Sequence, residues 1–177
     1  NMFLDSAFNQ NISRWNMSSV ENMEGMFKDS VFDQDVLNWD VGNVADMKST
    51  FENSVFNHDI SNWDVASVNT MRDMFLRSIF DREIGLWDVS NVDDMTFMFG
   101  LSKFNQDIAN WDVSNVNGFS NIFFQADFSQ NVCWDTTENL GITNDFPNGP
   151  SCSTENPTKN PTNSPSNNPT EMPTQEP

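Results

Sequence analysis

The feature that most constrains the fold of this chain is a tryptophan that recurs every 24 residues. Other apolar residues keep the same step, so that six apolar columns run in phase along the chain. One repeat of this length cannot bury its own apolar face, whereas stacked repeats can, and the sequence therefore predicts a solenoid. The columns comprise Trp15, Trp39, Trp63, Trp87 and Trp111; the phenylalanines at positions 3 and 8 and every 24 residues beyond; and a methionine, a valine and an isoleucine column that include Met47, Val44 and Ile60.

The pattern inside one repeat predicts its secondary structure. Apolar residues at Val36, Trp39 and Val41 alternate with outward polar residues, which indicates a short strand. The following apolar residues are spaced by three and four, as on one face of a short helix. The period lies in the leucine-rich-repeat range. We therefore predict a right-handed, leucine-rich-repeat-like α/β solenoid with one short parallel strand and one short helix in each coil, and with the aromatic columns in its core rather than on a ligand-stacking surface.

Composition divides the chain into three parts. Residues 1–132 carry the repeat, in about five full coils, and 133–153 read as a C-terminal cap. Cys133 and Cys152 bracket the cap, which predicts a disulfide, the alternative being two free thiols. Residues 154–177 have a proline at every fourth position, as in an extended stalk or linker. Its hydroxyl residues are candidate O-glycosylation sites unless the segment is a plain spacer: Thr158, Thr162, Ser166, Thr170 and Thr174.

The charge of the chain limits the classes of partner that it is expected to bind. Eight basic and 26 acidic residues give a net charge of −18 at pH 7. This disfavours nucleic acid and anionic membrane surfaces, both of which attract positive faces. No apolar run is long enough to span a bilayer, so no membrane insertion is expected of this segment. A single histidine, His58, occupies a polar column and should face solvent, and no catalytic constellation can be assembled around it. We therefore do not expect an enzyme.

Two outward columns are candidate sites. In one, stacked carboxylates could bind a bridging Ca²⁺, the alternative being that each carboxylate accepts hydrogen bonds that shape a turn: Asp40, Asp64, Asp88 and Asp112. In the other, Asn38, Asn62 and Asn110 give either a flat face that binds proteins or glycans or a simply solvated surface. Two N-x-S motifs make Asn11 and Asn16 candidate N-glycosylation sites.

The repeat resembles the BspA-like leucine-rich-repeat surface proteins. The segment from Phe104 to Val116 carries the motif F-N-Q-D-I-x-x-W-D-V-x-x-V most clearly, and the Pro-Thr tail is similar to stalks of microalgal surface proteins. The resemblance implies a secreted or cell-surface location and a role in adhesion and protein interaction, with no catalytic residues in the motif. We thus predict an extracellular structural and interaction module that binds protein or glycan, the alternative being a Ca²⁺-dependent glycan-binding adhesive module. Because Asn1 lies inside a coil, we also expect a fragment of a larger, self-assembling or fibre-forming protein.

Overall fold

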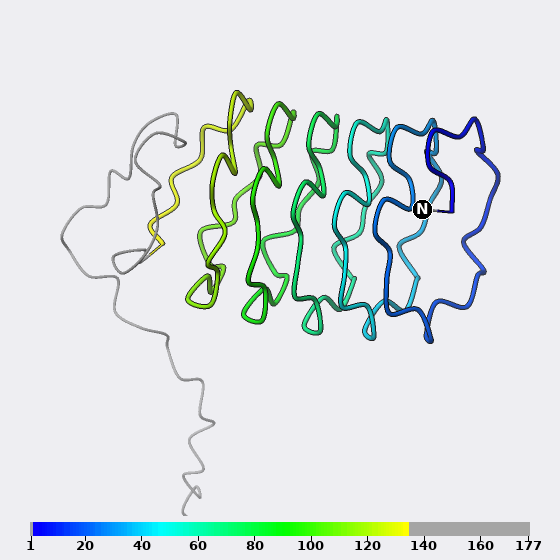
Figure 1. Ribbon diagram of the computed structural model, residues 1–177, viewed down its shortest axis with the longest axis horizontal. Helices are drawn as coiled ribbons and strands as arrows, with labels where there is room; N and C mark the ends of the chain where they lie inside the picture. The colour runs from blue at the N-terminus through cyan, green and yellow to red at the C-terminus, as the bar shows by residue number, and fades with distance from the viewer. Residues whose placement is uncertain (1, 135–177) are drawn as a thin grey trace, which may run out of the picture.

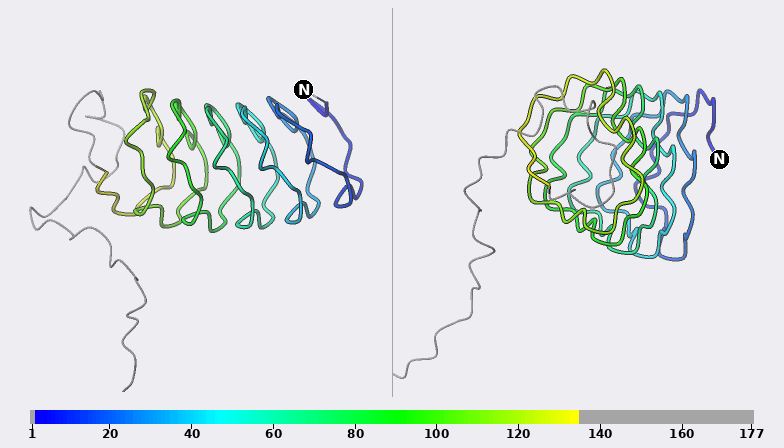
Figure 2. Two further views of the ribbon diagram at one scale, coloured as in Figure 1. Left: turned by 90° about the horizontal axis from the view of Figure 1, so that it is seen from below. Right: turned by 60° about the vertical axis from the view of Figure 1, so that its left-hand side comes forward.

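The computed structural model describes residues 2–134. In these residues the chain winds in coils that stack side by side, one coil for each 24-residue repeat (Figure 1). Figure 2 shows the same stack from below and obliquely, with successive coils lying nearly in register. Equivalent residues of successive repeats are therefore neighbours along the stack, as the repeat predicts.

The secondary structure within each coil differs from the prediction. Residues 2–134 contain no helix and no strand, so the predicted α/β architecture is wrong. In this part of the chain, β pairing is confined to isolated parallel bridges between successive coils. The bridges join Asn22 to Asp46, Asp46 to Thr70, Thr70 to Asp94, and Asp94 to Gly118.

The segment predicted as a helix is a run of tight turns. In the coil that begins at Met71, alternate amides bond to the carbonyl three residues earlier in the same coil, as Met74 does to Met71 at 3.1 Å. The amides between them donate to the next coil, as Asp73 does to Thr96 at 2.9 Å. An α-helix satisfies its amides within one segment, whereas here half of them hold two coils together. This alternation is the physical reason why a helix does not form.

A second backbone feature enforces the turns. Two residues in each run, four positions apart, adopt a positive φ, such as Asp73 at 56° and Arg77 at 58°. Left-handed residues interrupt a right-handed helix and are typical of the third residue of a type II turn. Gly, Asn and Asp tolerate this conformation best, and they occupy many of these positions, including Gly25 at 57° and Asn53 at 52°. The recurrence of such residues at a spacing of four is the sequence signal that distinguishes this run from a helix.

The segment predicted as a strand consists of two further turns. The amide of Trp39 donates to the Val36 carbonyl at 3.0 Å, and the amide of Val44 donates to the Val41 carbonyl at 2.8 Å. The alternation of sides was nevertheless predicted correctly. Trp39 and Val41 are buried, while Asn38 and Asp40 are exposed.

The aromatic columns form the core, as predicted. Phe51 and Phe75 stack with ring centroids 5.8 Å apart, and Phe75 also stacks on Phe80 of its own coil at 4.2 Å. Tryptophan rings stack in the same way, with Trp39 6.4 Å from Trp63. Trp15 differs, because 41% of its surface is exposed in the first described coil. Each stacked aromatic pair contributes roughly 0.5–1.5 kcal/mol beyond the burial of its area.

Candidate functional site: the two long sides of the stack

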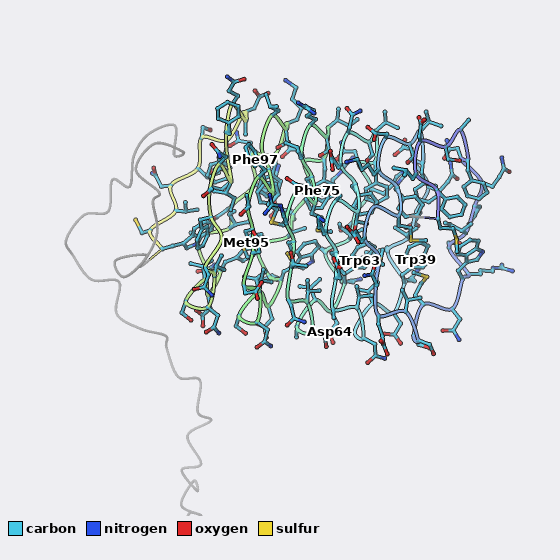
Figure 3. The ribbon with its side chains drawn as sticks, viewed as in Figure 1. Trp39, Trp63, Asp64, Phe75, Met95 and Phe97 are labelled. Carbon is cyan, nitrogen blue, oxygen red and sulfur yellow. The ribbon has the colours of Figure 1, made fainter. Side chains whose placement is uncertain are left out.

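One long side of the stack is acidic, and we call it the acidic edge. It consists of the paired turns at residues 35–43, 59–67, 83–91 and 107–115, which contain eight carboxylates and no lysine or arginine. All eight are exposed. Asp64 marks this side at the bottom of Figure 3, and Phe97 lies towards the opposite side. The carboxylates of the acidic edge are Asp35, Asp40, Asp59, Asp64, Glu83, Asp88, Asp107 and Asp112.

The aspartates of the predicted calcium column shape the turns that carry them. The backbone amide of Ala66 donates to Asp64 Oδ1 at 3.1 Å. Both the amide and the hydroxyl of Ser90 donate to Asp88 Oδ1, at 3.1 and 2.6 Å. Asp40 and Asp112 accept the equivalent bonds from the amides two residues on, at 3.4 and 3.1 Å. These bonds correspond to the alternative that the sequence left open, a role in local turn geometry.

The hydroxyl of Ser90 and then its amide hold the pKa of Asp88 below its usual range. The amide and then the hydroxyl of Ser61 do the same for the pKa of Asp59. Both aspartates therefore favour the charged form. A lowered pKa caused by hydrogen bonds of this kind is the expected property of a carboxylate that accepts a turn bond.

Carboxylates from two successive coils of the calcium column nevertheless lie near Gly42. Asp64 Oδ2 and Asp40 Oδ1 lie 3.4 and 3.6 Å from the point where a Cβ of Gly42 would stand. Within residues 2–134, no three His, Cys, Asp or Glu side chains gather as a metal-binding group. Two carboxylates alone are a sparse ligand set for Ca²⁺, which takes six to eight oxygen ligands. The calcium site stays a prediction.

The asparagine column differs from the aspartate column in its hydrogen bonds. Asn38, Asn62 and Asn110 are exposed. In the described part of the chain, none of the three side chains makes a hydrogen bond to protein, whereas other asparagines of the same edge do: Asn91 Nδ2, for example, donates to the Ala66 carbonyl at 2.8 Å. The three amides therefore keep both donor and acceptor groups for an outside partner.

Leu86 stands in the asparagine column and breaks it. Its side chain is 92% exposed. It borders a hollow of about 430 Å³ whose lining also includes Glu83, Asp107 and Asn110. An apolar side chain so fully exposed between carboxylates has no role in the core of the stack, and sequence reasoning did not assign it one.

The opposite side of the stack carries ion pairs in its first coils. Lys28 Nζ lies 2.7 Å from Glu52 Oε2, and Lys48 Nζ lies 3.0 Å from Glu24 Oε1. The hydrogen bond and charge of Glu24 raise the pKa of Lys48 above its usual value. Nearby, burial raises the pKa of Asp73. These pairs bridge successive coils.

The same side becomes apolar in the later coils. We call Leu76, Phe97, Leu101 and Phe124 the apolar patch. Phe97 and Phe124 meet edge to face with ring centroids 6.1 Å apart, and Phe124 is 39% exposed. Phe97 and Leu76 have room because Gly100 lies beside them: a Cβ there would stand 2.9 Å from Phe97 Cδ1 and 3.1 Å from Leu76 Cδ1. Sequence reasoning missed this patch. Its signal was the appearance of Phe97 and Leu101 in columns that hold polar residues or glycine in the earlier coils, and of Phe124 in the column of Lys28 and Glu52.

The remaining predicted sites divide between described and undescribed residues. Asn11 and Asn16 are exposed, and their Oδ1 atoms accept the amides of Ser13 and Ser18 at 2.9 and 3.0 Å. His58 is partly exposed, with Nε2 3.1 Å from Asp33 Oδ1. Cys133 lies at the end of the described part. Cys152 and the hydroxyl column of the tail lie outside the described residues: Thr158, Thr162, Ser166, Thr170 and Thr174. No helix among the described residues is long and apolar enough to cross a membrane.

Comparison with known proteins places the repeat in a family. The family model described as "Mycoplasma protein of unknown function, DUF285" matches residues 1–79 and 55–158. No curated protein matches the chain, and no solved structure matches it. The two matches together span most of the chain and overlap, as expected when one model of a repetitive sequence fits a tandem array twice. The chain therefore belongs to the DUF285 family.

Proposed function

We propose that this chain is an extracellular or cell-surface structural module that binds a protein partner in adhesion through its asparagine column. The observation that carries the proposal is the contrast between the two outward columns of the acidic edge. The aspartates accept hydrogen bonds from their own turns, whereas Asn38, Asn62 and Asn110 are exposed and bond to no protein group in the described residues. Repeated amides at a constant spacing suit a partner that presents a long polar surface.

The stacked coils support such a role because their buried polar groups are satisfied within the fold. Among the described residues, no buried side-chain nitrogen or oxygen lacks a hydrogen-bond partner. A surface that is ordered before binding loses little entropy when a partner docks. The cell-surface location rests on the resemblance to BspA-like proteins, on the two cysteines and on the Pro-Thr tail, which are features of secreted proteins.

The calcium-dependent alternative rests on the approach of Asp40 and Asp64 near Gly42. A cation held between two such carboxylates would leave coordination positions open for sugar hydroxyls. This alternative makes binding depend on Ca²⁺, whereas the leading proposal does not.

An array experiment separates the two. The full chain is applied to an array of extracellular proteins and an array of glycans, each with Ca²⁺ and with EDTA. We expect protein binding that is insensitive to EDTA and that falls at least about tenfold when Asn38, Asn62 and Asn110 are all replaced by alanine. The control variant replaces Ser120 and Gln125, which are exposed on the other side, and should bind normally. Signals on glycans alone that vanish in EDTA would favour the alternative, and protein binding unchanged in the triple variant would contradict the proposal.

A further inference from the structure

The two long sides of the stack contain unexplained features that complement each other. The acidic edge bears a fully exposed leucine, Leu86, beside a hollow lined by carboxylates. The opposite side bears the apolar patch. We propose that the apolar patch of one copy docks on the Leu86 region of the acidic edge of a second copy. This contact shares Asn110 with the surface of the partner binding proposed above, but it does not depend on that proposal.

Two residues of the apolar patch occupy backbone positions that disfavour bulky side chains. Phe97 and Leu101 adopt positive φ values of 54° and 57°. Their columns hold Gly25, Asp73 and Asn53 in other coils, which are residue types that tolerate this conformation. A bulky residue is disfavoured there. Neither side chain is fully buried, so core packing does not offset this cost. The same two positions have a positive φ in the other described turn runs, so the turn imposes the conformation, and what sets Phe97 and Leu101 apart is their apolar side chains on a partly exposed surface.

Charge favours a second copy as the occupant. Arg77 lies directly after Leu76, is exposed and has no ion pair among the described residues. The hollow beside Leu86 offers Glu83 and Asp107 and contains no basic side chain. An aromatic ring of the patch would enter the hollow against Leu86, and Arg77 would face its carboxylates. At about 0.15 M salt the screening length is roughly 8 Å. The charges of Arg77, Glu83 and Asp107 at the contact therefore outweigh the repulsion between the negative charges of more distant parts of the two chains.

The two surfaces lie on different sides of the stack, as Phe97 and Asp64 in Figure 3 show. A contact between unlike surfaces leaves one free surface of each kind on every pair, so that assembly continues. The contact therefore predicts open-ended growth rather than closed dimers.

Sedimentation velocity of the full chain across a concentration series tests this prediction. Wild-type chains should grow without a fixed stoichiometry. The edge variant Leu86→Asn, which restores the residue of its column, should weaken self-association at least about tenfold. The patch variant combines Phe97→Ser and Phe124→Glu, which place residues found in the same columns at Ser49 and Glu52. Far-UV circular dichroism confirms that each variant is folded, and Arg77→Glu serves as the patch variant if the double replacement unfolds the chain.

The decisive measurement mixes the edge and patch variants. Each alone should be a monomer, and the mixture should form a 1:1 dimer that grows no further, because only one patch and one edge remain functional. Replacing Asn38 by alanine is the control and should leave growth unchanged. Wild-type chains that stay monomeric at high concentration, a variant that still grows alone, or a mixture that does not associate would each overturn the proposal.

Discussion

At the scale of the residue, the tryptophan column does more than fill the core. The indole Nε1 of Trp63 donates to the Val36 carbonyl of the preceding coil at 3.1 Å, and Trp87 and Trp111 make the same bond to Ile60 and Ile84 at 3.2 Å. Each indole thus satisfies a backbone carbonyl of the adjacent turn while it buries its ring. Phenylalanine could fill the space but not make the bond, which favours tryptophan in this column at positions 39, 63, 87 and 111.

Replacing Trp63 by alanine should cost about 3–5 kcal/mol of unfolding free energy, because the change opens a cavity and removes one of the two donors to the Val36 carbonyl, which keeps only the Trp39 amide. Trp15→Ala should cost less than about 2 kcal/mol, because that ring is already partly exposed. Denaturant unfolding followed by circular dichroism measures both. Equal costs at the two positions would show that burial in the stack does not set the contribution of this column.

The hydrogen bonds at Asp88 predict a dependence on pH. A pKa lowered in the folded state stabilises the fold above the ordinary value of about 3.9, and this stabilisation disappears as the pH falls through the folded pKa. Asp88→Asn keeps an oxygen acceptor but removes the charge. Wild type should therefore be slightly more stable than the variant at pH 7 and equal to it well below pH about 3. Melting temperatures across this range check the result, and a constant difference would contradict it.

At the scale of the element, each coil is built from turns whose amides point alternately within the coil and towards the next one. Such turns depend on close backbone contacts between coils. Gly85 shows one such contact: a Cβ at this position would stand 2.4 Å from the Asp107 carbonyl oxygen of the next coil. Gly42, which occupies another turn of the acidic edge, has only side-chain atoms nearby, the nearest at 3.4 Å.

Gly85→Ala should therefore destabilise the chain by about 1–3 kcal/mol, because a backbone carbonyl must move. Gly42→Ala is the matched control and should be neutral or stabilise by up to about 1 kcal/mol, since alanine restricts the unfolded chain. Thermal melts of both variants measure the difference. Similar effects at the two glycines would argue against the close approach at Gly85.

The sequence correctly predicted the stacked coils and which side chains face the core, but it did not predict the backbone conformation within each coil. In the turn run that starts at Met47, the buried residues include Thr50, Phe51 and Ser54, which is the spacing of a helix face. A run of turns with left-handed residues every four positions gives the same burial pattern, so periodicity alone does not separate them. Only the residue types at the positive φ positions do so, and they are mixed, as Arg77 and Phe97 show.

The candidate sites were predicted unevenly for a related reason. Asparagines and aspartates repeat in register, so their columns were visible in the sequence. Leu86 and the apolar patch depart from the repeat, so the regular columns of the sequence do not predict them. Their exposure depends on inter-coil packing, such as the space above Gly100, which only the three-dimensional arrangement defines.

At the scale of the whole molecule, each described coil touches mainly its two neighbours, and stability should be close to a sum of coil and interface contributions. A change that preserves the 24-residue step should therefore preserve the fold. Deleting residues 59–82 joins His58 to Glu83 and keeps every column in phase.

This deletion should leave a folded chain with a lower denaturation midpoint, because one coil and one interface are lost. Deleting one residue fewer, 59–81, moves all later residues out of their columns and should unfold the coils beyond the junction. Circular dichroism and denaturant unfolding of both variants test the prediction. Equal behaviour would show that column register does not hold the stack together.

The alternating amides also give the stack a direction. In the turn runs inside the described stack, the coil offers its carbonyls to the preceding coil and its amides to the following one, as Ser49 donates to Arg72 and Asp73 to Thr96. Fewer backbone bonds run the other way, such as that from Asn69 to Ala45. Each peptide has a dipole of about 3.5 D, so the excess of bonds in one sense makes the two flat faces of a coil electrically unlike. Each coil is therefore polar along the stacking axis. A further repeat, in the same chain or another, extends the array only if its amides and carbonyls face in the same directions.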